Sequence, residues 1–277
     1  MKNYIGISRD HSASMRSIAH VAGQDYNSKV DSIKEASHTN KQNTIVSVVE
    51  CGSGHTDLVK RVVVNSDVNA LEHIDNYVAN GMGTPLLDSV GDLIEQFESV
   101  PDRNNDDVSF LVMAITDGYE NRSRRYDSVS LARKIRQLTA TDRWTFVFRV
   151  PRGYTENLTR LGIPAGNILE WDQTERGVMT ASKQDNEAFT QYFAARSSGA
   201  TSVDKFYSNL SDVTSEDVEE VLTDISQEVT IYPVSAKDDG KQIRTFVEDR
   251  LSGNDKMLKG AAFYQLTKTV VCEEECP

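Results

Sequence analysis

Residues 4–14 read Tyr-Ile-Gly-Ile-Ser-Arg-Asp-His-Ser-Ala-Ser, an apolar run that passes directly into a polar segment. The first five of these residues have the composition of a short buried strand. A carboxylate at Asp10 and hydroxyls at Ser12 and Ser14 follow at alternate positions. We therefore expect a buried strand whose carboxyl end directs three side-chain oxygens toward one point.

Short apolar runs alternate with helical periodicity along the chain, which is typical of βαβ units around a mostly parallel sheet. The predicted strands are residues 4–8, 44–49, 58–64, 108–115, 144–150 and 167–171. The predicted helices are residues 15–36, 86–97, 128–138, 185–193 and 216–226, with a loop at 195–203. The second and third strands are expected to form a hairpin. The sequence thus predicts an α/β fold: a doubly wound, mostly parallel sheet with one antiparallel edge strand and helices on both faces.

The chain is long enough for one domain of ordinary size and a smaller appendage. We expect residues 1–226 to form the main domain. From about Gln227 the pattern changes to strand 229–234, helix 242–251 and strand 260–271. Residues 227–277 are predicted to be a small C-terminal β-α-β extension or the start of a second small domain.

The composition argues against several classes of protein. The formal net charge of −12 is the opposite of the basic footprint of a duplex nucleic-acid binder. No run reaches the roughly 18 apolar residues of a membrane span. Three cysteines are too few for a disulfide framework, and no signal peptide is visible, so we expect a cytoplasmic protein. Cys272 and Cys276 are expected to be free thiols on a charged tail.

Two further oxygen donors stand in contexts that match the first stretch. One lies in Gly-Met-Gly-Thr-Pro-Leu at 81–86, where a helix is predicted to begin, and the other in Ala-Ile-Thr-Asp-Gly at 114–118, after a predicted strand. Ligands of open α/β sheets bind at the carboxyl ends of strands, so these loops are expected to converge. Oxygen donors suit a hard divalent cation, Mg²⁺ or alternatively Mn²⁺ or Ca²⁺. The predicted ligands are Asp10, Ser12, Ser14, Thr84 and Asp117.

Each of these residues also has a purely structural interpretation. Asp10, Ser12, Ser14 and Thr84 could cap the helices that follow them. Asp117 could belong to a simple turn. His11, beside the site, is expected to be solvated rather than to gate ligand entry. Cys51 is expected to be a buried structural thiol, although His55 nearby also raises the possibility of a cysteine nucleophile.

The segments Asp10-x-Ser-x-Ser, Gly-x-Gly-Thr84-Pro-Leu and Ile-Thr-Asp117-Gly resemble the metal-ion-dependent adhesion site (MIDAS) of von Willebrand factor A (vWA) domains. Their order and spacing match that pattern across roughly residues 1 to 200, and all five ligand positions are present. The chain departs from the pattern at Ala13, where many members have glycine. It departs again at Arg9, where an apolar residue is commoner and where the charge could alter the rim of the site.

The resemblance implies a sheet between two layers of helices and movement of the last main-domain helix on ligation. It also implies that Ser12, Ser14 and Thr84 bind the metal directly in some states, with Asp10 and Asp117 holding it directly or through water. The partner is expected to be a protein that supplies an Asp or Glu side chain to the metal. By analogy with bacterial or phage intracellular members, the chain would serve a larger assembly.

The favoured function is a divalent-cation-dependent protein-binding module of vWA type that is not an enzyme, because no base or nucleophile accompanies the predicted oxygen cluster. A metal-assisted phosphoester hydrolase is an alternative, since the same cation could polarise a phosphoryl oxygen. His11 would be its candidate base. A structural assembly subunit in which the ion only stabilises the fold is a third hypothesis.

Overall fold

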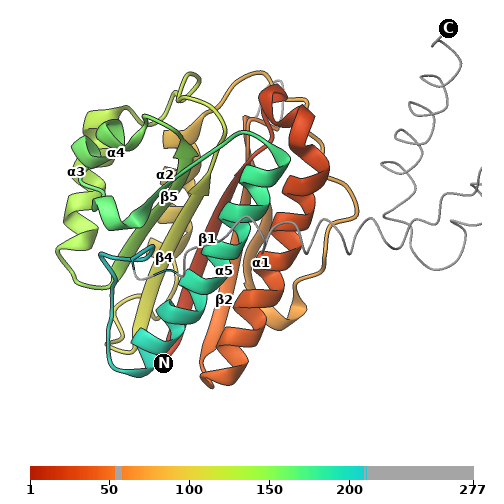
Figure 1. Ribbon diagram of the computed structural model, residues 1–277. Coiled ribbons are helices and arrows are strands. Elements are labelled where there is room, and N and C mark those ends of the chain that lie inside the picture. The colour runs from red at the N-terminus through yellow and green to blue at the C-terminus, as the bar shows by residue number, and fades with distance from the viewer. Residues whose placement is uncertain (54–57, 209, 211–277) are drawn as a thin grey trace, which may run out of the picture. The chain divides into compact units, whose positions relative to one another are not determined.

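Six strands form one sheet in the computed structural model, which describes residues 1–53, 58–208 and 210 (Figure 1). Each strand overlaps a predicted one. β1, β4 and β5 are buried along almost their whole length, as is expected where helices cover both faces of a parallel sheet. The strands are β1 (Lys2–Asp10), β2 (Asn43–Cys51), β3 (Val59–Asp67), β4 (Val108–Ile115), β5 (Trp144–Pro151) and β6 (Ile168–Trp171).

The strand order is β3-β2-β1-β4-β5-β6. β2 and β3 pair antiparallel, and the other neighbouring strands pair parallel. The predicted α/β class, with its mostly parallel sheet and one antiparallel edge, is therefore confirmed. The chain builds outward from β1 on one side and from β4 on the other, so its direction reverses between these two strands. Such a reversal opens a crevice at the carboxyl ends of the strands, where open α/β sheets bind their ligands.

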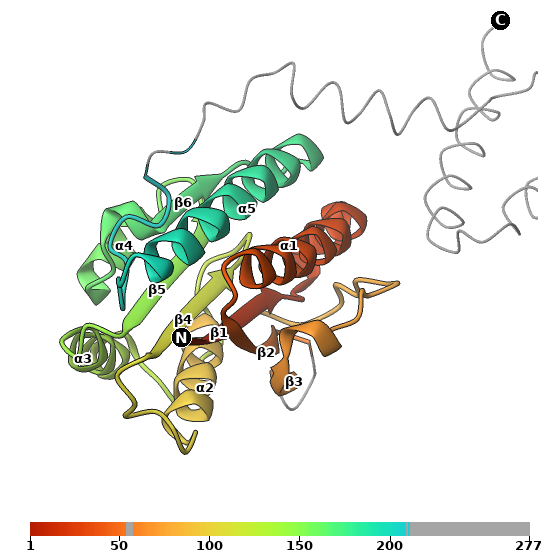
Figure 2. The ribbon, with the colours of Figure 1, turned by 90° about the horizontal axis from the view of Figure 1, so that it is seen from below.

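Helices cover both faces of the sheet. α1 and α5 lie side by side on one face, and α2 and α3 lie on the other (Figure 2). The short α4 packs beside α3. The helices are α1 (Ala19–Thr39), α2 (Leu86–Glu98), α3 (Ser128–Thr139), α4 (Thr155–Leu161) and α5 (Glu175–Ser197).

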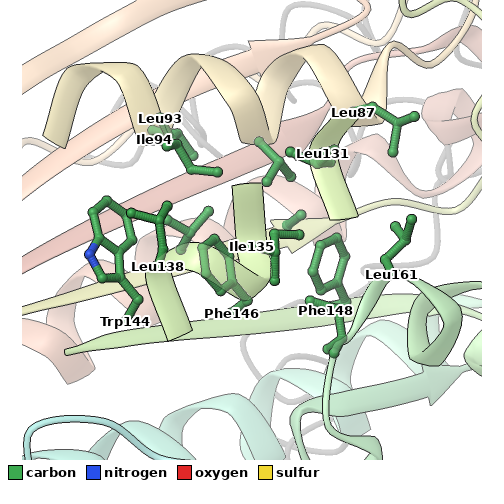
Figure 3. Close-up of a cluster of buried hydrophobic side chains, with 14 of the residues drawn as sticks. Leu87, Leu93, Ile94, Leu131, Ile135, Leu138, Trp144, Phe146, Phe148 and Leu161 are labelled. Carbon is green, nitrogen blue, oxygen red and sulfur yellow. The ribbon is translucent and has the colours of Figure 1, made fainter. Parts of the chain in front are cut away.

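Two buried apolar clusters hold these layers together. On one face, side chains of α2 and α3 such as Leu93 and Ile135 meet Phe146 and Phe148 of β5 (Figure 3). On the other face, apolar residues of α1 and α5 cover β1, β2 and β4. The doubly wound arrangement leaves the ends of the parallel strands uncovered by these helices, and the loops there are free to form a site.

Three helices differ from their prediction. Residues 13–18 form a 3-10 helix (Ala13–Ile18), so α1 begins at Ala19. The Ala13 N–H at its start is bonded to Gly81 O of a neighbouring loop at 3.0 Å. α5 begins at Glu175 instead of residue 185 and ends at Ser197, inside the predicted loop. Its first turns bury few apolar residues, so they carry little helical periodicity. The unpredicted α4 is too short to show a period.

Part of what the sequence predicts cannot be compared with the structure. The helix at 216–226, the elements of residues 227–277 and the boundary between the two predicted domains lie outside the described residues. Cys272 and Cys276 lie there too. Among the described residues, no helix is long and apolar enough to cross a membrane.

Four charged side chains are buried together between α1, β5 and α5. Arg149 binds Asp25 (Nη2 to Oδ2, 2.9 Å) and Asp185 (Nη1 to Oδ2, 2.8 Å). Lys29 Nζ binds the same two carboxylates at 3.0 and 2.6 Å, and the Tyr207 hydroxyl donates to Asp185 at 2.7 Å. Although burial by itself raises the pKa of Asp25, the charges of Arg149 and Lys29 lower it to about 2. The cluster is therefore a neutral set of two cations and two anions that joins α5 to the sheet.

Candidate metal centre

Asp10 ends β1 and is fully buried. Its Oδ1 accepts a hydrogen bond from Ser12 N at 2.8 Å. Its Oδ2 accepts from Thr116 Oγ1 at 2.6 Å and from Thr84 Oγ1 at 3.4 Å. One carboxylate thereby joins the loop after β1, the loop before α2 and the end of β4.

The hydroxyls of Ser12 and Ser14 form the second half of the cluster. Ser12 Oγ lies 2.9 Å from Ser14 Oγ, and Ser14 Oγ donates to Asp117 Oδ1 at 2.8 Å. Together with Asp10 and Thr84, these residues complete the set of five predicted from the sequence, and the fold brings all five to the carboxyl ends of β1 and β4.

The capping alternatives do not describe these side chains. Ser12 occupies the N-cap position of the 3-10 helix, but its side chain makes no capping hydrogen bond there. The N-cap position of α2 is Pro85, and the hydroxyl of Thr84 donates instead to Asp10. The backbone of Thr84 is held by Asn121, whose side chain accepts from Thr84 N at 2.9 Å. The Thr84 backbone is thus held in place by Asn121, while the Thr84 hydroxyl is directed into the cluster.

Gly118 leaves space next to the hydroxyl oxygens. A Cβ atom at this position would lie 3.2 Å from Thr84 Oγ1, 3.9 Å from Thr116 Oγ1 and 4.0 Å from Ser14 Oγ. The same region opens into a cleft of about 380 Å³. A small ion next to Gly118 could therefore contact several oxygens at once and still be reached from outside.

The electrostatics of the cluster favour a cation. Burial raises the pKa of Asp10. Burial and the nearby charge of Asp10 raise the pKa of Asp117 to about 6, although the hydrogen bond from Ser14 opposes this shift. Within the described part of the chain neither carboxylate forms a salt bridge, and no group of three His, Cys, Asp or Glu side chains forms a metal cluster. Two carboxylates with three hydroxyls are the oxygen set that a hard divalent ion accepts, so the residues fit such an ion.

Several residues around the cluster were not identified from the sequence. Thr116 orients Asp10 and also accepts from Gly118 N at 3.0 Å. The Tyr77 hydroxyl donates to Asp10 O, Trp171 Nε1 donates to Thr116 O at 3.1 Å, and Gln173 Nε2 donates to Asp117 O. Thr116 could have been inferred from its place inside the quoted motif. The other three come from distant segments and carry no local signal.

The prediction that His11 is solvated is wrong. Its side chain is buried, its ring stacks on Tyr77 with centroids 4.2 Å apart, and its Nδ1 lies 2.7 Å from Val78 O. Burial lowers its pKa, against the opposing charge of Glu50. Arg9 is buried as well and binds Glu50 Oε1 at 3.1 Å, so it does not stand at the rim. The segment that covers both residues has no periodic pattern from which this burial could be foreseen.

Cys51 is buried, as predicted. Burial raises the pKa of its thiol well above the ordinary value, which disfavours the reactive thiolate. His55, the partner that the nucleophile hypothesis requires, lies outside the described residues. The thiol is therefore a packed core group.

Gly118→Ala is expected to weaken Mg²⁺ binding about tenfold or more, comparable with the loss of a supporting residue around a metal. The added methyl group would crowd Thr84 Oγ1 and occupy the space beside the hydroxyls. Isothermal titration of the full chain measures the change. Gly23→Ala, in α1, is the matched control because its Cβ would make only an ordinary contact with Tyr77 at 3.4 Å. Equal affinities of Gly118→Ala and wild type would contradict this placement of the ion.

The metal-free protein is expected to lose stability through Asp117 as the pH rises from 3.8 to about 6. Between these values the folded chain binds the Asp117 proton more tightly than the unfolded chain does, so losing the proton lowers the free energy of unfolding. Thermal unfolding in EDTA would show this as a wild-type Tm that falls relative to that of Asp117→Asn. A wild-type Tm that stays level with, or rises relative to, the Tm of Asp117→Asn over this pH range would refute the raised pKa of Asp117.

The sequence matches no protein-family profile and no curated protein. The solved structures to which the chain is similar include the pilus adhesin SpaC from Lactobacillus rhamnosus GG, with 11% identity and a TM-score of 0.50 over 69% of this chain and 30% of that one. They also include proximal thread matrix protein 1 from the mussel byssus, with 16% identity and a TM-score of 0.47 over 68% of this chain and 48% of that one.

One structure of the mussel protein is described as having a zinc-occupied MIDAS motif. The chain spans about half of the mussel protein and less than a third of SpaC. At these identities the similarity concerns the fold alone. The doubly wound α/β architecture that the resemblance to vWA domains implies is the fold of this chain.

Proposed function

We propose that this protein is a divalent-cation-dependent binding module that captures an acidic side chain of a protein partner. The observation that carries the proposal is the cluster of two buried carboxylates and three hydroxyls beside an open cleft. Asp10, Ser12, Ser14, Thr84 and Asp117 would hold the cation. The bound cation would supply the positive charge to which a carboxylate of the partner binds.

The donor chemistry favours Mg²⁺, with Mn²⁺ or Ca²⁺ as alternatives. All five donors are oxygens, and hydroxyls are poor ligands for soft metals. Because only two of the five are carboxylates, the ion retains the capacity to accept a further carboxylate. A cytoplasmic location and a bacterial or phage origin remain predictions from the sequence.

A binding role is favoured over the hydrolase hypothesis by the position of His11. This candidate base is buried against Tyr77 and is absent from the residues that line the cleft. Mg²⁺-dependent turnover of a phosphate ester that is lost in Asp117→Ala would revive the hydrolase.

The proposal is tested by retaining proteins from an extract of the native host on the immobilised full chain in Mg²⁺ and eluting with EDTA. Proteins released by EDTA from the wild type should be missing from Asp117→Ala and present on Asp106→Ala, which alters an exposed carboxylate. Proteins that stay bound in EDTA would favour the structural assembly subunit instead. Retention that is equal on Asp117→Ala and wild type would refute the proposed site.

A further inference from the structure

The loop between β4 and α3 is fastened to the amino end of α2 by two carboxylates. Glu120 accepts from Leu87 N at 2.9 Å and from the backbone N–H groups of Arg122 and Ser123 at 2.9 and 2.8 Å. Asp88 accepts from three further backbone N–H groups, those of Arg124, Arg125 and Tyr126. Although most of its side chains are exposed, the loop has a defined backbone. The backbone positions from which its side chains extend beside the cleft are therefore fixed.

Arg122 crosses from this loop to the opposite wall of the cleft. Its Nε donates to Met82 O at 3.1 Å. Its Cγ occupies the space that a Cβ atom on Gly83 would fill, and Gly83 has φ +115°, a conformation that favours glycine. Arg122 and Met82 line the same cleft as the hydroxyls of Ser12, Ser14 and Thr84.

The Arg122 guanidinium has spare donor capacity. Its Nε makes the bond to Met82, and no salt bridge joins Arg122 to a carboxylate within residues 1–53, 58–208 and 210. Arg125 in the same loop differs, since it binds Asp92 and Glu95. A guanidinium offers five N–H groups in a planar fork that fits a carboxylate with two parallel hydrogen bonds. Arg122 therefore presents an unused carboxylate-binding group at the mouth of the cleft.

Charge and exposure define what would bind beside Arg122. The chain carries a net charge of −12, so an acidic partner is repelled at long range and needs local positive charge to bind. Met82, on the wall of the same cleft, is 58% exposed and offers an apolar surface to a partner. The cleft thus combines a predicted cation, a fixed arginine and an apolar contact.

We propose that the partner is an acidic segment with two carboxylates, one for the cation and a second for Arg122, and with an aliphatic portion over Met82. This inference rests on the proposed function, since the first carboxylate needs the cation. Arg122 then determines specificity: it distinguishes a partner that has a second Asp or Glu at the right spacing from one that offers a single acid.

The probe is a library of random heptapeptides displayed on phage, selected on the full chain in Mg²⁺ and eluted with EDTA. Wild type and Arg124→Gln, an exposed arginine of the same loop, should select peptides with two acidic residues at a recurring spacing. Arg122→Gln should select peptides with one. In a synthetic two-acid peptide, changing the second acid to its amide should weaken binding to wild type about tenfold and leave binding to Arg122→Gln unchanged.

The outcomes separate this inference from the proposed function. Peptides that wild type releases in EDTA but that carry a single acid would overturn the role of Arg122 and leave the cation-dependent capture intact. The role of Arg122 would also be overturned if changing the second acid of the peptide to its amide weakened binding equally for wild type and Arg122→Gln. If no peptide is released by EDTA, both proposals fail. Equal melting temperatures of wild type, Arg122→Gln and Arg124→Gln would exclude misfolding as the cause of any difference in the peptides that they bind.

Discussion

Asp10→Asn is expected to weaken Mg²⁺ binding by at least about 100-fold, since residues that merely support a metal ligand already contribute about 10- to 100-fold. Asp10 is fully buried, and its carboxylate joins Ser12, Thr84 and Thr116. The amide keeps the shape but removes the charge and one acceptor oxygen. Isothermal titration of the full chain measures the loss, and Asp106→Asn should bind like the wild type.

Thermal unfolding separates the loss of binding from a loss of folding. Burial raises the pKa of Asp10, so the ionised carboxylate is costly in the absence of a cation. The metal-free Asp10→Asn protein is therefore expected to be at least as stable as metal-free wild type at neutral pH. Mg²⁺ at 100 times its Kd should stabilise the wild type alone by about 2.7 kcal/mol, or roughly 5 to 10 °C in Tm. An equal rise in both proteins would exclude Asp10 as a ligand.

Asp185→Ala is expected to lower the free energy of unfolding by about 3 to 5 kcal/mol, because removing one partner of a buried ion pair strands the other charges. Lys29 and Arg149 are fully buried and would share the single carboxylate of Asp25. The corresponding fall in Tm is roughly 6 to 20 °C for a domain of this size. Urea unfolding measures the free energy directly.

The charge-balanced double variant Asp185→Leu with Lys29→Met is the matched control. It removes one charge of each sign and keeps the pair of Arg149 with Asp25, so it should recover most of the lost stability. Glu156→Ala breaks an exposed pair with Arg160 within α4 and should leave Tm unchanged. If Asp185→Ala also leaves Tm unchanged, the network does not hold α5 to the sheet.

The central strands were predictable because burial on both faces produces continuous apolar runs. Val108–Ile115 was predicted with the bounds it has in the structure. The first half of α5 was not predictable, because it places polar residues at most positions and begins with a Thr174 cap that only the bond to Gly177 N reveals. Helices of this kind depend on tertiary contacts more than on their own pattern.

The candidate site likewise has a part that was predictable from the sequence and a part that was not. Asp10, Thr84 and Asp117 stand in short motifs at strand and helix ends, so their convergence follows from the topology of a parallel sheet. Their role as metal ligands stays a prediction. The burial of His11 depends on Tyr77, which comes from an irregular segment, and such contacts leave no trace in local spacing.

The distances along the chain between bonded residues bear on how the protein acquires its site during synthesis. Ser14 and Asp117 are separated by 103 positions, and Arg196 at the end of α5 donates to Asn3, 193 positions away. When a nascent polypeptide has left the ribosome exit tunnel only as far as β2, which ends at Cys51, the loops that carry Thr84 and Asp117 have not yet emerged. An ion that binds all five oxygens would therefore favour chains that have emerged beyond Asp117 and folded over shorter nascent forms.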